Sequence, residues 1–127
     1  MHQNDVISLI ADALPSYRVW SNRVPKNVTP TPDLYILLTD IAISEYAECK
    51  GVNEWLISMN IDVNSVYSQG YDTTDIVNDA VSDIIPRIKS LPVVKNSRLD
   101  GSRSMTYDTP THTVTRQILT FSFWVNR

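Results

Sequence analysis

The clearest structural signals in this chain lie in WLISMNIDVNSVY (residues 55–67) and DTTDIVNDAVSDIIPRI (residues 72–88). In the first stretch, the apolar residues at every second position from Trp55 to Val63 are each followed by a residue that is polar in four cases of five. Because successive side chains of a strand point to opposite faces, this alternation predicts a strand with one buried and one solvated face. In the second stretch, apolar residues recur at helical spacing and form one stripe, which predicts an amphipathic helix.

The same patterns extend this interpretation to the whole chain. We expect a first helix that ends before Pro15, strands at residues 17–24, 34–48, 93–107 and 114–125, and, because of Pro86, a kink or end of the second helix near Ile85. The strand at 93–107 is weak and is interrupted by Asp100-Gly101. In the strand at 34–48, one face is expected to carry Tyr35, Leu37, Ile41 and Ile43.

The element order is therefore helix, three strands, helix, two strands. Two helices cannot cover both faces of a five-stranded sheet, so we expect both of them on one face. The fold class is α+β, with a single mixed or antiparallel sheet in one domain over residues 1–127. The second face of the sheet is left to solvent or to partners.

The net charge of −3 is unevenly distributed along the chain. Residues 33–83 hold ten acids and one base, whereas residues 84–127 hold seven bases and two acids. The two parts either neutralise each other within the fold or make a surface that is acidic on one side and basic on the other. The second arrangement favours head-to-tail association, which closes into a ring when the rotation permits.

The sequence offers little chemistry. His2, His112 and Cys49 lack partners at motif spacing, and a single cysteine excludes an internal disulfide. The acids Asp72, Asp75, Asp79 and Asp83 are spaced as the solvated face of a helix. We expect no catalytic, cofactor or metal site, no membrane span and no secretory signal, and synthesis in the cytosol. A pI near 5.2 argues against a dedicated nucleic-acid binder, despite the basic residues after Ile85.

The candidate functional residues are therefore contact residues. Trp124 lies on the opposite phase of the last strand from Leu119, Phe121 and Phe123, so a helix, a loop or a partner must cover it. The predicted subunit or partner interface comprises Asp75, Asp79, Asp83, Arg98, Asp100, Arg103, Tyr107 and Trp124.

Four segments carry a family resemblance: YRVW (residues 17–20), PTPDLYILL (residues 30–38), IDV (residues 61–63) before the amphipathic helix, and the terminal FSFWV (residues 121–125). In their order along the chain, they resemble the tail-terminator (tail completion) proteins of long-tailed bacteriophages. The resemblance implies a hexameric ring in the virion, at the head-proximal end of the tail tube. The ring would contact the tail tube protein and the neck or head–tail connector, and DNA would pass through its lumen without specific recognition. The family has no catalytic motif to carry over.

Two other interpretations stay open. A neck or head-completion adaptor of the same virion would share these features. A small protein-binding module that acts as a monomer or dimer belongs to a different class. An enzyme is the weakest choice, because nothing in the sequence pairs a base with a nucleophile.

Overall fold

The computed structural model describes residues 2–27, 33–49, 52–68, 73–92 and 94–126. The elements follow in the predicted order: α1 (Gln3–Ala13), β1 (Val19–Ser21), β2 (Leu34–Cys49), β3 (Val52–Ser68), α2 (Thr74–Lys89), β4 (Val94–Asp108) and β5 (His112–Asn126). The strands form one sheet in the order β1-β2-β3-β5-β4. The short β1 pairs parallel to β2, and all other neighbours are antiparallel.

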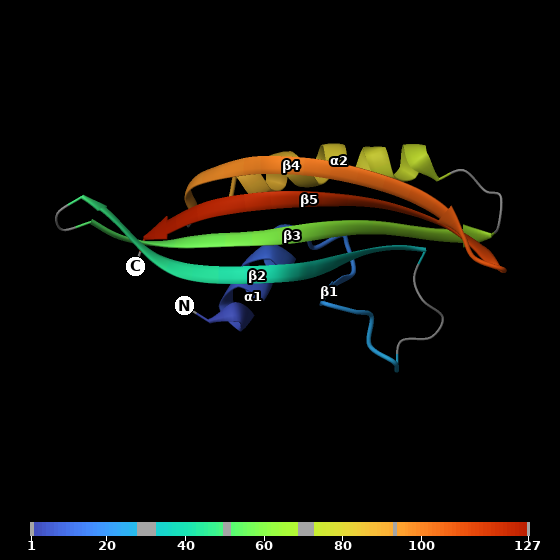
Figure 1. The fold of residues 1–127 in the computed structure, drawn as a ribbon, viewed down its shortest axis with the longest axis horizontal. Coiled ribbons are helices and arrows are strands. Elements are labelled where there is room, and N and C mark those ends of the chain that lie inside the picture. The colour runs from blue at the N-terminus through green and yellow to red at the C-terminus, as the bar shows by residue number, and fades with distance from the viewer. Residues whose placement is uncertain (1, 28–32, 50–51, 69–72, 93, 127) are drawn as a thin grey trace.

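Both helices pack on the same face of this sheet, as the sequence predicts. Figure 1 shows the long strands β2 to β5 side by side, with α1 and α2 behind them. The two helices join one hydrophobic core, α1 through Val6 and Ile10 and α2 through residues that include Val77 and Ile84. The α+β fold class is therefore confirmed, and neither of the described helices lies over the opposite face of the sheet. We call this opposite face the open face.

The alternation in β3 has the predicted effect on the helix side. Ile57, Met59, Ile61 and Val63 are all buried there. They pair across the strands with an equivalent row on β5, for example Ile61 with Leu119. Burial of these branched and aromatic side chains provides the main driving force for this half of the fold.

The second helix runs further than predicted. It continues through Pro86 to Lys89, so an end near Ile85 is wrong. The loss of one backbone donor at Pro86 is tolerated here because Ile84 and Ile88 on either side of it are fully buried against the sheet. Tertiary packing thus overrides a local helix breaker.

A bulge in β2 reverses which of its side chains face the core. The predicted placement of its four apolar residues on one face is therefore wrong. Ile36 and Leu38 are buried in the core, so Tyr35 and Leu37 lie on the open face. The register then shifts between Thr39 and Ala42, where Asp40 has a positive φ of 53°. One extra residue reverses the side-chain phase, and Ile41 and Ile43 join the core further along the strand.

The predicted interruption at Asp100-Gly101 is a bulge rather than a break. β4 stays paired with β5 along its whole length, with a register shift between Leu99 and Gly101. Leu99 packs against the core before the shift, whereas Arg98 and Arg103, which pair with Ser122 and Ile118, face the open side. The strand is continuous here because only Asp100 is left out of the ladder at this bulge, and a second register shift, between Val94 and Asn96, leaves out Lys95 in the same way.

Candidate assembly surfaces

On the open face, polar side chains of neighbouring strands form hydrogen bonds and an ion pair with one another. Arg116 of β5 contacts Asp62 of β3, with 2.6 Å between Nη2 and Oδ2. Asn60 donates to Asp40 at 2.9 Å and accepts from Thr120 at 2.9 Å, which links β2, β3 and β5. These bonds join side chains from strands distant in sequence and hold the central strands in register.

This face is less solvated than the sequence predicts. Asp62 and Asn64 are each only 3% exposed, although both occupy the phase predicted to face water. The guanidinium of Arg116 compensates the Asp62 charge, and this hydrogen bond raises the pKa of Arg116. Asn64 donates to the backbone oxygen of Asp62 at 3.0 Å. Burial is possible here because the polar groups have partners.

Three predicted contact residues come together at the β4 bulge. Arg98 and Ser122 both donate to the carboxylate of Asp100, and the guanidinium carbon of Arg98 lies 5.3 Å from the centroid of the Trp124 ring. The hydrogen bonds from Ser122 and then from Arg98 lower the pKa of Asp100. A cation from the same face therefore partly covers Trp124, whereas both described helices lie on the other side of the sheet.

The end of β4 presents a more exposed row on the open face. Arg103, Met105 and Tyr107 occupy alternate positions that pair with Ile118, Arg116 and Val114 of β5. We call these three residues the β4 row. Among the described residues, Tyr107 (45% exposed) and Met105 (37%) are the large hydrophobic side chains that remain exposed. No described carboxylate lies within ion-pair distance of Arg103, which borders a hollow of about 320 Å³ beside Gly101.

The predicted acidic residues lie elsewhere, on α2 behind the sheet. Asp75 and Asp79 are exposed. Asp83 instead connects α2 to the segment between α1 and β1. Its carboxylate accepts hydrogen bonds from the hydroxyl of Tyr17 at 2.8 Å and from Nε of Arg87 at 3.0 Å. These two hydrogen bonds lower the pKa of Asp83. Burial of the Tyr17 side chain, together with its hydrogen bond to Asp83, raises the pKa of Tyr17 to about 12. Asp72 lies outside the described residues.

In the folded structure, the uneven charge distribution of the sequence is partly retained between the helices and the strands β4 and β5. The two helices carry five acids and two bases, whereas β4 and β5 carry four bases and two acids. On the open face, ion pairs join Lys95 to Glu54, Arg98 to Asp100 and Arg116 to Asp62. The basic strands are thus largely neutralised by described acids on the same face, with Arg103 as the exception, and the helix layer keeps its acidic excess.

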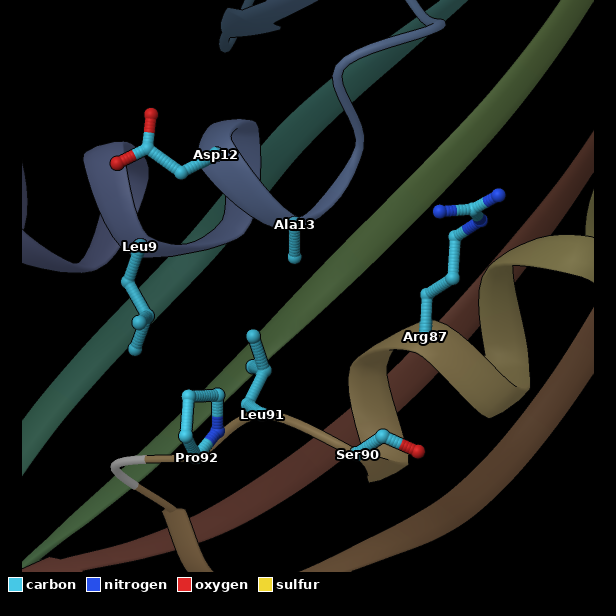
Figure 2. A pocket seen from close by; sticks show the side chains of 7 residues that line it. All are labelled: Leu9, Asp12, Ala13, Arg87, Ser90, Leu91 and Pro92. Carbon is cyan, nitrogen blue, oxygen red and sulfur yellow. The ribbon is translucent and has the colours of Figure 1, made fainter.

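A pocket between the helices is a surface that sequence reasoning missed. Its volume is about 430 Å³, and we call it the helix pocket; it is lined by Leu9, Asp12, Ala13, Arg87, Ser90, Leu91 and Pro92. Figure 2 shows Leu9 and Ala13 of α1 opposite Leu91 and Pro92, which follow α2. No periodicity could reveal this pocket, because it depends on how the two helices pack together. Both Asp12 and Pro92 are exposed to solvent.

Side chains that could ligate a metal do not cluster in the described part of the chain. No group of three or more His, Cys, Asp or Glu side chains there could hold a metal ion. His112 begins β5 at the surface, where its Nδ1 lies 2.7 Å from the hydroxyl of Thr111. Neither described helix combines the length and the apolar character that crossing a membrane requires. The absence of enzymatic activity stays a prediction.

Comparison with known proteins gives matches among solved structures but not among protein families or curated proteins. No protein-family model matches the chain, and no curated protein matches it. Among solved structures, 23 chains match. One is a chain from a structure described as "Virion of native gene transfer agent (GTA) particle", with 20% identity over 93% of this chain and 84% of that chain and a TM-score of 0.47. At this identity and TM-score, the match decides neither a family nor a role.

Proposed function

We propose that this protein is a structural component of a phage virion that forms a ring at the head-proximal end of the tail tube. There it ends polymerisation of the tube and joins the tail to the neck. The proposed ring is a hexamer that contacts the tail tube protein below and the connector above, while DNA passes through its lumen without specific recognition. The role is structural, with no catalytic step.

The observation that carries this proposal is the difference between the two faces of the molecule. The helix layer is acidic and holds an apolar pocket, whereas the open face carries the β4 row, in which Arg103, without a described carboxylate partner, lies beside exposed Met105 and Tyr107. Unlike surfaces that complement each other favour heterologous contacts, in which the front of one copy meets the back of the next. Such contacts close into rings when the rotation between copies is suitable.

The position in the tail rests on the resemblance of the chain to tail-terminator proteins in the order of its elements. That order is present in the fold, from α1 through the long β3 and α2 to the terminal strand β5. The two alternatives differ in what the ring contacts. A neck adaptor would bind the head connector without stopping tube growth, and a binding module would stay monomeric or dimeric.

The direct test combines light scattering with tube assembly. We expect the purified chain to form a ring, alone or on tube ends, and to shorten tubes when added to polymerising tail tube protein. Arg103→Glu should weaken both effects, because it reverses the cation of β4 and β5 that no described carboxylate pairs. Lys26→Glu is the matched control, since Lys26 is exposed in the loop after β1 and changes the net charge equally.

Two results would contradict the proposal. A chain that stays monomeric at high concentration and on tube ends would favour the binding module. Rings that leave tube growth unchanged would favour the neck adaptor. Imaging virions that carry a labelled copy should place the label at the capsid–tail junction, and a label elsewhere would exclude both virion roles.

A further inference from the structure

The β4 row and the helix pocket are too far apart to meet within one molecule. Ser90, Leu91 and Pro92 of the pocket come just before β4 begins at Val94, and Tyr107 lies 13 residues further along that strand. At the rise of an extended strand this separation is roughly 40 Å. The row also faces the open side, whereas the pocket lies between the helices on the other side. Any contact between them must join two molecules.

The two surfaces match in chemistry. The pocket has an apolar wall of Leu9, Ala13, Leu91 and Pro92, and the row supplies exposed thioether and phenol side chains. An aromatic side chain transferred into such a pocket buries about 150–250 Å² of its own surface. The pocket volume of about 430 Å³ is in the range of sites that enclose small ligands, so it can receive such side chains.

The charges match as well. Asp12 at the pocket has no described ion-pair partner, because the neighbouring Arg87 is paired with Asp83. In the row, Arg103 also lacks a described carboxylate partner and precedes Met105 by two residues on the same face of the strand. Seating Met105 against the apolar wall therefore brings Arg103 toward Asp12, an acid without a described ion-pair partner.

We infer that the β4 row of one copy docks into the helix pocket of the next, with Met105 and Tyr107 as apolar anchors and Arg103 facing Asp12. The occupant of the pocket is thus a second copy of this chain. This contact rests on the proposed head-to-tail assembly and specifies which surfaces make it. Because the donor and acceptor surfaces differ, each copy can use both at once, as a ring requires.

The first experiment compares self-association of the wild-type chain with that of Met105→Ser combined with Tyr107→Ser. Loss of buried interface anchors should weaken association about tenfold or more in sedimentation or light scattering. Thr106→Ser is the control, since Thr106 is exposed on the same strand but takes the opposite phase. Both anchors are exposed in the single chain, so unfolding midpoints should stay close to wild type.

The second experiment uses cysteine cross-linking in a Cys49→Ser background. Chains with Ala13→Cys are mixed with chains with Met105→Cys under oxidising conditions, and we expect a disulfide-linked dimer of the two. Replacing the second partner by Thr106→Cys moves the thiol to the opposite phase and should remove the cross-link. The pair of mixtures tests the direction of the contact as well as its place.

The outcomes separate the two proposals. Association at wild-type strength in the double serine variant, or equal cross-linking by the two thiol positions, would overturn the pocket contact and leave the ring intact. If the wild-type chain does not associate even on tube ends, the ring and this contact both fail. If the variant still forms rings but no longer stops tubes, the β4 row binds the tube protein, and the second-copy assignment is wrong.

Discussion

The two faces of the sheet bury side chains by different chemistry. Behind the sheet, Ile61, Leu119 and Phe121 are fully buried in an apolar core under two helices. On the open face, Asp62 is almost as inaccessible although neither described helix covers it, and Arg116 compensates its charge. Apolar packing tolerates many arrangements, whereas a buried ion pair requires its specific partner. The comparison predicts that the covered face sets most of the stability and the open face sets strand register and assembly.

The largest effect is expected from Phe121→Ala on the covered face. Phe121 is fully buried and stacks on Phe123 with 5.7 Å between ring centroids. Truncation should lower the free energy of unfolding by about 3–5 kcal/mol, measured by urea denaturation. Thr120→Ala serves as the matched control, because Thr120 directly precedes Phe121 and faces the opposite side of the sheet. This change should lower the free energy of unfolding by about 1 kcal/mol through loss of the hydrogen bond to Asn60. Equal losses would contradict the contrast between the faces.

A smaller loss should follow from Asp62→Ala, which leaves Arg116 partly buried without its partner. We expect about 2–3 kcal/mol in the same measurement, because the bond involves charged groups. Replacing both residues, with Asp62→Leu and Arg116→Met, should recover much of this loss, since an apolar pair avoids the unpaired charge. A double variant that is as unstable as Asp62→Ala would contradict this explanation, because the loss would then not come from the unpaired charge of Arg116.

Ser122→Ala tests the bulge cluster and its dependence on pH. Loss of the hydroxyl should cost about 1 kcal/mol and raise the pKa of Asp100 toward its ordinary value, followed by NMR titration. The folded-state pKa of Asp100 lies below the unfolded one, so its contribution is present above the ordinary pKa of 3.8 and is lost as pH falls through the folded value. The variant should therefore show a weaker acid dependence of stability than wild type. If the stability of the variant fell with acid pH as it does in wild type, the hydrogen bond from Ser122 would not be what lowers the pKa of Asp100.

The smallest effect is expected from Tyr17→Phe, which removes one hydrogen bond to Asp83 on the helix side. The cost should be about 0.5 kcal/mol. The pKa of Tyr17 is raised to about 12 from 10.0, so its contribution is full below pH 10 and is lost as pH rises through 12. Ultraviolet titration of tyrosinate should show the loss of one late-ionising group. A titration identical to wild type would contradict the assignment.

The covered face could be predicted because its signals are local. The alternation in β3 and the helical stripe of α2 each lie within one segment, and burial of one face is their direct consequence. The grouping in β2 failed because one bulge residue, Asp40, reversed the phase halfway along the strand. A bulge depends on the partner strand, so periodicity within a single strand does not reveal it.

The candidate contact residues divide in a similar way. Arg98, Asp100 and Trp124 meet at the β4 bulge, and Arg103 and Tyr107 share one row, because β4 and β5 are adjacent in sequence and pair as a hairpin. The acids of α2 lie on the other side of the sheet, and Asp83 is engaged by Tyr17. The helix pocket and the pairing of Asp62 with Arg116 depend on contacts between distant segments, which the local pattern of a single sequence does not reveal.

The position of β4 at the sheet margin has a consequence for the free protein. Its outer backbone groups have no partner strand among the described residues, and long strands of this kind invite uncontrolled stacking into fibrils. Two register shifts and the charged side chains of Lys95, Arg98 and Arg103 interrupt the regular template that such stacking needs. The same irregularities that shape the open face thus also oppose aggregation of the free chain through this strand.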